Sequence, residues 1–269
     1  MILSHANRTL LLLFVASATA VWLSCQPPMP QSTTYHCFAD HRTILGIPHF
    51  LNVASNVPFL LIGVEGVRFL FSTRDRRRGG PVEEPAIWAA YLALFVGVGL
   101  TAFGSAYYHL YPDNARLMWD RLPMAVAFMG LFTAIIAERI DLRAGKFLLM
   151  PLLAAGVWSV LYWRETDDLR PYYYVQFFPL AVLPLMLLLF PPRYTRTGDL
   201  LVALGWYVVA KFCENPLDET IFEAGQVVSG HTLKHLAAAL GAYELLRMVK
   251  RRERIAPREA RSAPLPGRG

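Results

Sequence analysis

The sequence predicts an all-α integral membrane protein, a seven-transmembrane helix bundle preceded by an N-terminal signal peptide or an extra helix. The composition is the first reason, because 55% of the 269 residues are hydrophobic and only 17% are charged, where soluble proteins have about a quarter. The second is a series of apolar runs near the length that crosses a bilayer. The third is the concentration of Lys and Arg in alternate connections between those runs.

Eight apolar stretches are long enough to be membrane helices. The connections between them carry the charged residues, prolines and glycines that a lipid-exposed helix does not easily accommodate. No linker between soluble domains is evident, so we expect a signal peptide or signal-anchor helix at 1–25, one membrane domain at 26–248 and a basic tail at 249–269. The stretches lie near 9–25, 50–71, 86–110, 118–137, 147–163, 173–190, 199–214 and 227–248.

The first stretch fits two interpretations. Arg8 followed by TLLLLFVASATAVWLSC has the charged start and apolar centre of a cleaved secretory signal, and an uncleaved signal anchor has the same pattern. Both place residue 26 and its successors outside. Cys25 is not expected to carry a lipid, because Trp22 departs from the small aliphatic residues that precede a lipoprotein cysteine.

The distribution of basic residues predicts the orientation. The connections after the second, fourth and sixth stretches are basic, and so is the tail, whereas NPLDETIFEAG has no Lys or Arg. The positive-inside rule therefore places the C-terminus in the cytoplasm. The series of the last seven helices then begins outside and ends inside, as in a bacterial-type inner membrane protein. Because topology accounts for the net charge of +6, we do not expect a nucleic-acid partner.

This topology brings five polar residues to one depth near the outer face. Ser105 and His109 lie four residues apart at the outer end of one predicted helix, Asp120 lies at the start of the next, and His231 and His235 open the last. Residues four apart share a helix face. Ionisable groups in a membrane are costly and normally face the bundle interior with partners, so the set of five indicates a functional site.

The residue types of this set favour a metal hydrolase. Three neutral imidazoles with an open fourth position are typical of a catalytic zinc site, and His109, His231 and His235 supply them. Zinc lowers the pKa of a bound water toward about 7. Asp120 is then expected to act as general base, and Ser105 as a hydrogen-bond donor to the developing oxyanion. We expect hydrolysis of a carbonyl compound that is a lipid, because the site lies within the membrane.

Other functions remain open at this point. A lipid-sensing receptor could retain zinc for structure alone, and an ester lipid would serve the same chemistry as an amide. A transporter or a haem protein would use transmembrane histidines differently, since haem requires ligands on opposite sides of one iron. The placed acid and serine favour the hydrolase.

The motifs around these residues resemble those of alkaline ceramidases, which belong with the progestin and adipoQ receptors to the CREST superfamily. GSAYYH is similar to their Ser-x-x-x-His, DRLPM to their Asp-x-Leu-Pro-Met, and HTLKH to their His-x-x-x-His, while Asn52, Ser55 and Asn56 match their Asn-x-x-Ser-Asn. The resemblance covers about residues 37–245. It implies seven core helices, zinc on the three histidines, and hydrolysis of ceramide-like amides to a sphingoid base and a fatty acid.

Two further expectations concern a difference from the alkaline ceramidase sequences and a possible disulfide. The acidic calcium-binding stretch of those ceramidases is replaced by HCFADHRTILGIPHF, where Asp40 is the only acid and His49 stands where a glutamate is expected. Calcium needs six to eight oxygen ligands, so we do not predict a calcium site. The resemblance places a cysteine near Cys37 and another near Cys213, which makes a disulfide between them a hypothesis.

Four other polar features receive structural interpretations. Glu65 and Arg68 are expected to pair with each other, and Lys211 to extend toward the outer interface. Lys234 is expected to leave a different helix face from its two neighbouring histidines. Residues 172–174, all tyrosines, are expected to form an interfacial aromatic belt.

Overall fold

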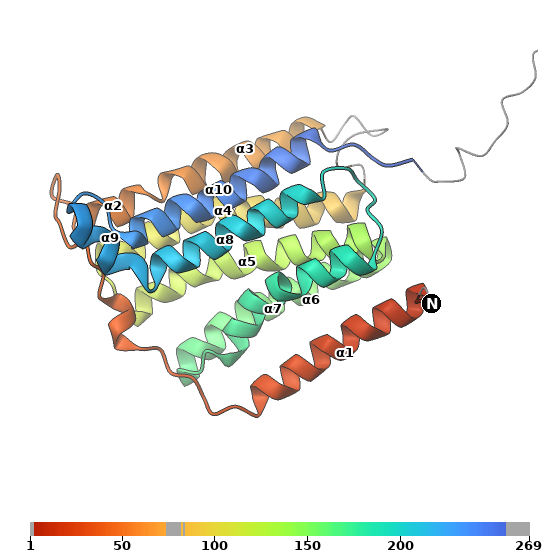
Figure 1. Cartoon of the computed structure of the whole chain (residues 1–269), viewed down its shortest axis with the longest axis horizontal. Helices are drawn as coiled ribbons and strands as arrows, with labels where there is room; N and C mark the ends of the chain where they lie inside the picture. Colours follow the sequence, from red (N-terminus) through yellow and green to blue (C-terminus); the bar gives the residue numbers. More distant parts are fainter. Residues whose placement is uncertain (1–2, 74–81, 83, 257–269) are drawn as a thin grey trace, which may run out of the picture.

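Helices account for nearly all regular structure in the computed structural model, which describes residues 3–73, 82 and 84–256. They run roughly alongside one another as an elongated bundle (Figure 1). No strand occurs among these residues. In order the elements are α1 (His5–Ser24), η1 (Thr33–His36), α2 (Phe50–Ala54), α3 (Val57–Thr73), α4 (Pro85–Leu110), α5 (Asn114–Arg139), α6 (Leu142–Thr166), α7 (Arg170–Leu189), α8 (Gly198–Glu214), α9 (Leu217–Gly225) and α10 (Gly230–Arg251).

The helices are long and apolar enough for a multi-pass membrane protein, as predicted. Within the described residues six segments could cross a membrane by length and hydropathy, with α2 and α3 counted as one, and a seventh results if α8 and α9 form one span bent by 72°. The helix α10 does not meet this test, although its 22 residues correspond to a length of about 33 Å. Its histidines, lysines, glutamate and arginines lower its hydropathy, and the two histidines are buried inside the bundle.

Side-chain caps mark where several helices begin. Asp113 accepts a hydrogen bond from the backbone N–H of Arg116 at the start of α5, and Ser229 accepts one from Thr232 at the start of α10. Such caps satisfy backbone donors that have no partner within the helix. Both caps lie at the end of the bundle where α4 finishes, and we call this the histidine end.

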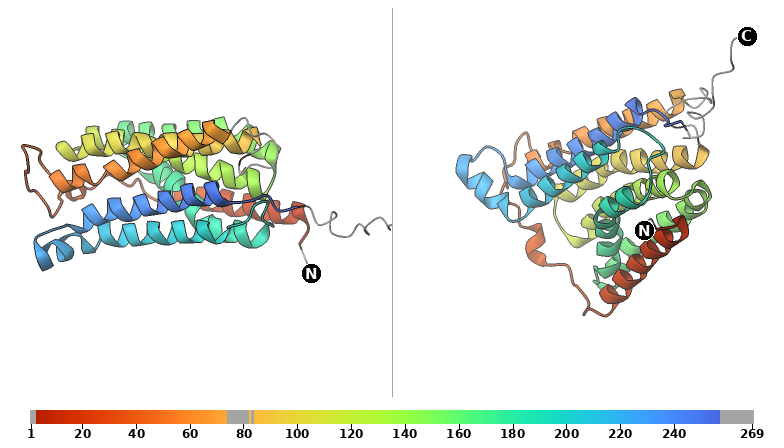
Figure 2. Two further views of the ribbon diagram at one scale, coloured as in Figure 1. Left: turned by 90° about the horizontal axis from the view of Figure 1, so that it is seen from above. Right: turned by 45° about the vertical axis from the view of Figure 1, so that its right-hand side comes forward.

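The core is formed by α4 and α5, which pack along each other, with α3 against α4, α6 against α5, and α10 against α8 (Figure 2). The helix α1 lies at the edge of the bundle and contacts α7. The helix α7 packs on α5 and α6, but within the described part of the chain it contacts α8 only weakly. This leaves a less tightly packed region between α7 and α8.

The predicted helices are all present, with boundaries shifted by a few residues and the second divided into α2 and α3, and two short elements, η1 and α9, were missed. The short helix α9 occupies part of NPLDETIFEAG, which the charge and proline content predicted to be a loop. Glu65 and Arg68 form the expected ion pair at 2.8 Å. The predicted basic connection around Arg74–Arg78 and residues 257–269 of the predicted tail lie outside the described residues.

A buried charge cluster closes the end of the bundle opposite the histidine end. Arg252, which follows α10, forms an ion pair with Glu138 at 2.6 Å and donates a hydrogen bond to the Tyr91 hydroxyl at 2.9 Å. Its guanidinium also lies over the rings of Tyr91 and Tyr194. These contacts bind the end of α10 to α4 and α5.

Candidate metal centre and adjoining cavities

Two glycines allow the elements of the histidine end to approach closely. A Cβ atom at Gly104 of α4 would lie 2.1 Å from the Trp119 carbonyl oxygen of α5. A Cβ atom at Gly230 would lie 2.3 Å from the Cys213 carbonyl oxygen of α8. Only a residue without a side chain fits at such separations. The first glycine brings α4 against α5, and the second brings the start of α10 against the end of α8.

His109, His231 and His235 form one buried cluster, as the sequence predicts. Each offers a ring nitrogen, and these nitrogens all lie within 4.8 Å of one another. The Nε2 atoms of His109 and His231 are 3.3 Å apart. The three ring centroids are separated by 4.8 to 4.9 Å, so the three imidazoles lie at nearly equal distances from one another.

The cluster fits a metal ion by geometry and by donor type. Two nitrogens at the zinc–nitrogen distance on a tetrahedral ion are separated by about 3.3 Å, which matches the separation between His109 and His231. Ser55 Oγ lies 2.8 Å from Nδ1 of His235 and donates to the Asn52 carbonyl oxygen. His235 Nδ1–H is therefore the donor to Ser55, which leaves its Nε2 lone pair available.

Further contacts hold the cluster in place and cover it. Asp218 of α9 accepts a hydrogen bond from the His231 backbone N–H at 2.6 Å and another from Ala39 at 3.0 Å. The Phe38 ring lies 4.8 Å from the His109 ring and 4.4 Å from the His231 ring. The segment before α2 thus places an apolar side chain against the rings of His109 and His231.

An ion pair fixes the course of this covering segment. Arg42 binds Asp40 at 2.7 Å, and its two terminal nitrogens donate to the carbonyl oxygens of Gln226 and Val227 at 2.7 Å each. The hydrogen bonds from Arg42 hold the pKa of the Asp40 carboxyl below its usual value. The segment is therefore tied to the loop before α10.

Asp120 and Ser105 lie together beside the histidines. Both are buried, their side chains interact, and both line the same cavity as His235. The structure therefore brings all five predicted site residues to the histidine end of the bundle, from α4, α5 and α10.

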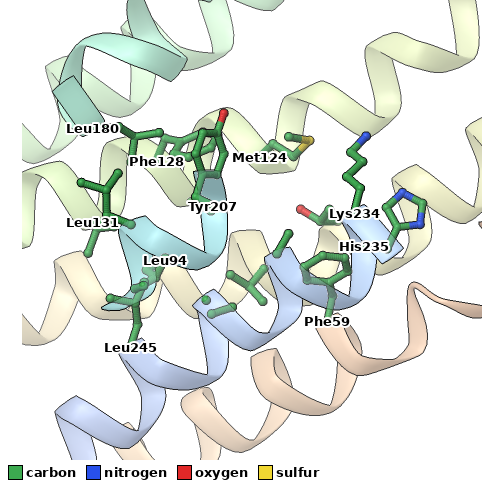
Figure 3. Close-up of a pocket in the computed structure, with 18 of the residues that line it drawn as sticks. Phe59, Leu94, Met124, Phe128, Leu131, Leu180, Tyr207, Lys234, His235 and Leu245 are labelled. Carbon is green, nitrogen blue, oxygen red and sulfur yellow. The ribbon is translucent and has the colours of Figure 1, made fainter. Parts of the chain in front are cut away.

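An apolar cavity of about 160 Å³ extends from these residues toward the middle of the bundle. Lys234 and His235 lie at one end, while Leu94, Leu131 and Leu245 lie at the other (Figure 3). Its polar lining is confined to the first end and to Thr101 and Tyr207. We call this space the apolar cavity.

A second space, of about 230 Å³, shares Asp120, Met124, Tyr207, Lys234 and Ala238 with the apolar cavity. We call it the polar chamber, because charged and polar side chains line much of it. The charged ones are Asp120, Arg121, Lys211, Glu214 and Lys234. A third, open pocket of about 900 Å³ shares lining residues with the polar chamber and also reaches His231. These two spaces lie in the loosely packed region between α7 and α8.

The polar chamber contains residues whose roles the sequence did not indicate. Lys234 leaves α10 toward α8, consistent with a separate face, but its long side chain lines the apolar cavity beside His235. It forms an ion pair with Glu214 at 2.6 Å, and Lys211 binds the same carboxylate instead of extending freely to the interface. Tyr172 is buried over the Arg121 guanidinium, so the belt prediction is wrong for this tyrosine. The position of Lys234 between two site histidines was the one feature of the sequence that could have indicated its place at the site.

The three cysteines are free in the structure. Cys37 and Cys25 are exposed, and Cys213 is half-buried. The hypothetical disulfide between Cys37 and Cys213 is therefore not formed.

No protein-family model matches this chain, and no curated protein matches it.

Proposed function

We propose that the protein is a zinc-dependent intramembrane hydrolase that cleaves the amide bond of ceramide-like lipids into an amine and a fatty acid. The observation that carries the proposal is the convergence of three buried imidazoles with Asp120 and Ser105 at the polar end of an apolar cavity. A purely structural metal site would require neither a buried carboxylate nor a cavity beside it. The motif resemblance to alkaline ceramidases supports the same chemistry.

The chain's own residues have distinct roles in the proposed reaction. Zinc on His109, His231 and His235 would supply Lewis-acid activation of water and of the carbonyl group. Asp120 accepts a proton from the attacking water and returns it to the leaving nitrogen as the carbon–nitrogen bond breaks. Ser105 donates a hydrogen bond to the carbonyl oxygen, where negative charge develops. The products are a carboxylic acid and an amine, so atoms and charges balance.

The apolar cavity supports an acyl lipid as the substrate. A hydrocarbon chain gains about 0.8 kcal/mol for each methylene transferred from water to an apolar site, and the cavity begins beside the proposed catalytic group. A lipid can reach it through the open pocket between α7 and α8. If the basic connections face the cytoplasm, the histidine end lies toward the outer face of the membrane.

The test combines metal analysis with lipid turnover. Purified wild type and His231→Ala are measured for zinc content and for release of fatty acid from a panel of ceramides and ester lipids. We expect about one zinc per chain and ceramide cleavage in the wild type, and loss of both in the variant, because two imidazoles and water hold zinc far more weakly than three imidazoles. His41→Ala is the matched control, since His41 is exposed at the same end and is not a member of the cluster of three histidines.

The other outcomes separate the alternatives. Wild type that binds zinc but hydrolyses no lipid would contradict the enzyme and favour a lipid-binding receptor. Cleavage restricted to esters would contradict the amide assignment. Wild type without zinc would mean that the 3.3 Å contact between His109 and His231 is only a hydrogen bond between neutral rings.

A further inference from the structure

The polar chamber contains a buried guanidinium that forms no ion pair with a carboxylate among the described residues. Arg121 is only 5% exposed. Its Nη2 donates to the Gln31 side-chain oxygen at 2.5 Å, whereas its Nη1 is buried without a hydrogen-bond partner. No carboxylate within the described part of the chain lies at ion-pair distance from it. An unpaired buried donor on a charged group is costly, so this atom identifies a position for an acceptor.

Aromatic side chains hold the guanidinium in a fixed position. It lies 4.2 Å from the Trp163 ring centroid, 4.9 Å from that of Tyr172 and 5.6 Å from that of Tyr35. Cation–π contacts of this kind compensate part of the desolvation of an arginine. They do not satisfy Nη1, which has no hydrogen-bond partner among the described residues, and a planar fork of donors suits carboxylate and phosphate oxygens.

The charges of the chamber are consistent with one additional negative charge. Its lining contains the cations Arg121, Lys211 and Lys234 and the carboxylates of Asp120 and Glu214. Three positive charges minus two negative charges leave a net charge of +1. Both lysines bind Glu214, whereas Arg121 forms no ion pair with either carboxylate of the chamber.

The two spaces also suit the two parts of one molecule. The apolar cavity and the polar chamber meet at Asp120 and Lys234. An acyl amide with its chain in the apolar cavity and its reacting carbonyl beside Asp120 would extend its other end into the polar chamber. We infer that Arg121 binds an anionic group, a carboxylate or a phosphate, on the head of the lipid substrate. The preferred substrates are therefore ceramide-like acyl amides whose head group carries a negative charge, an assignment that rests on the proposed hydrolase function.

The test compares two lipids that differ only in the head group. N-oleoylglycine and N-oleoylethanolamine have the same amide and the same chain, but end in a carboxylate and a hydroxymethyl group. In zinc-loaded wild type we expect kcat/KM for the anionic lipid to be about 10- to 100-fold higher, the range of a charged hydrogen bond. Arg121→Gln should reduce this ratio to near one. Arg116→Gln should leave it unchanged, because Arg116 is a half-buried cation on the same helix that pairs with Asp113 and does not line the polar chamber.

A binding measurement separates failure of this inference from failure of the proposed function. Ketone analogues of both lipids, with a methylene in place of the amide nitrogen, bind without being hydrolysed, and their Kd values are measured on the same zinc-loaded proteins. A preference for the anionic ketone that depends on Arg121 supports the subsite even if no amide is cleaved. Equal binding of both ketones, or a preference retained in Arg121→Gln, overturns it even if ceramide is cleaved.

Two controls complete the experiment. Inorganic phosphate is added at millimolar concentration, and if it binds through Arg121 as tightly as the anionic ketone does, the site takes a free anion and the substrate assignment is overturned. Arg121→Gln must retain zinc and elute as the wild type does in size-exclusion chromatography. If it does not fold, the ratio of the two ketones' Kd values in wild type decides, and a ratio near one overturns the inference.

Discussion

Arg121 and Arg252 are both buried arginines with aromatic rings over their guanidinium groups, but the protein satisfies their charges differently. Arg252 forms an ion pair with Glu138 and a hydrogen bond with Tyr91. Arg121 has the Gln31 amide and an unpaired nitrogen beside two cavities. A charge matched by the chain itself serves the fold, whereas a charge left unmatched beside a cavity is available to a ligand.

The comparison extends to the two ends of the bundle. At the end that contains Arg252, removal of a polar group should reduce stability and leave metal binding unchanged. At the histidine end, removal should mainly affect metal or ligand binding. The following substitutions test this division.

Glu138→Gln should produce the largest loss of stability. Removing one member of a buried ion pair leaves an uncompensated charge and costs about 3–5 kcal/mol. Thermal unfolding in detergent measures the loss, and zinc content should remain at the wild-type value. The control is Glu65→Gln at the same end, where the partner Arg68 is exposed and the second partner Lys250 is partly exposed, and a smaller change is expected because such pairs are screened by solvent. If Glu138→Gln lost zinc without losing stability, the division between the ends would be wrong.

Gly104→Ala should destabilise the protein and also disturb the site. The added methyl group would overlap the Trp119 carbonyl oxygen and force α4 away from α5, at a cost of about 1–3 kcal/mol. Because α4 holds His109 and α5 holds Asp120, zinc affinity and turnover should fall as well. Gly205→Ala is the matched control. That glycine lies in α8 with no atom within 4 Å of its added Cβ, so the substitution should be neutral or stabilising by about 0.5–1 kcal/mol.

Ser55→Ala should weaken metal binding with little effect on stability. Loss of the hydrogen bond to His235 Nδ1 frees the ring to rotate and lose its orientation, and second-shell changes of this kind reduce metal affinity about 10- to 100-fold. Competition with a chromogenic chelator measures the affinity. Ser159→Ala is the control, since this buried serine of α6 donates to the Gly156 carbonyl oxygen of its own helix. Equal zinc affinities in both variants would show that Ser55 does not position His235.

Most of the fold and the centre of the site could be predicted from the sequence, because both depend on patterns within single segments of the chain. Apolar runs identified the helices, and the spacing of His231 and His235 placed both rings on one face. Positive-inside topology then brought His109 and Asp120 to the same depth. These inferences need only periodicity and hydropathy, which each segment contains in itself.

The residues that the sequence did not identify depend on side-chain paths between segments. Phe38 belongs to an irregular segment whose course depends on its contacts with α9 and with the loop before α10. Lys234 is one residue from His235 and was assigned to another face, but its flexible chain curves toward Glu214 at the end of the preceding span. Arg121 follows the predicted base in sequence, and only the approach of Gln31, Trp163 and Tyr172 distinguishes it from a topology determinant. Contacts of this kind produce no periodic pattern in the sequence.

Asp40→Asn should give the smallest effect, because its partner Arg42 is partly exposed and the ion pair is screened by solvent. This pair lies at the histidine end, but each charge has a partner of opposite sign within the chain. Its loss should therefore affect stability rather than metal or ligand binding, as expected for the Arg252 cluster. The folded-state pKa of Asp40 lies below its unfolded value, and the stabilisation is therefore present above the unfolded pKa, about 3.9, and is lost as the pH falls through the folded pKa. Melting temperatures of zinc-free wild type and variant should differ by about 2 °C at pH 7 and converge below pH 4. A difference that persisted unchanged in acid would mean that the variant loses packing around Asp40 rather than a charge, and the matched pair would then not contribute through its ionisation.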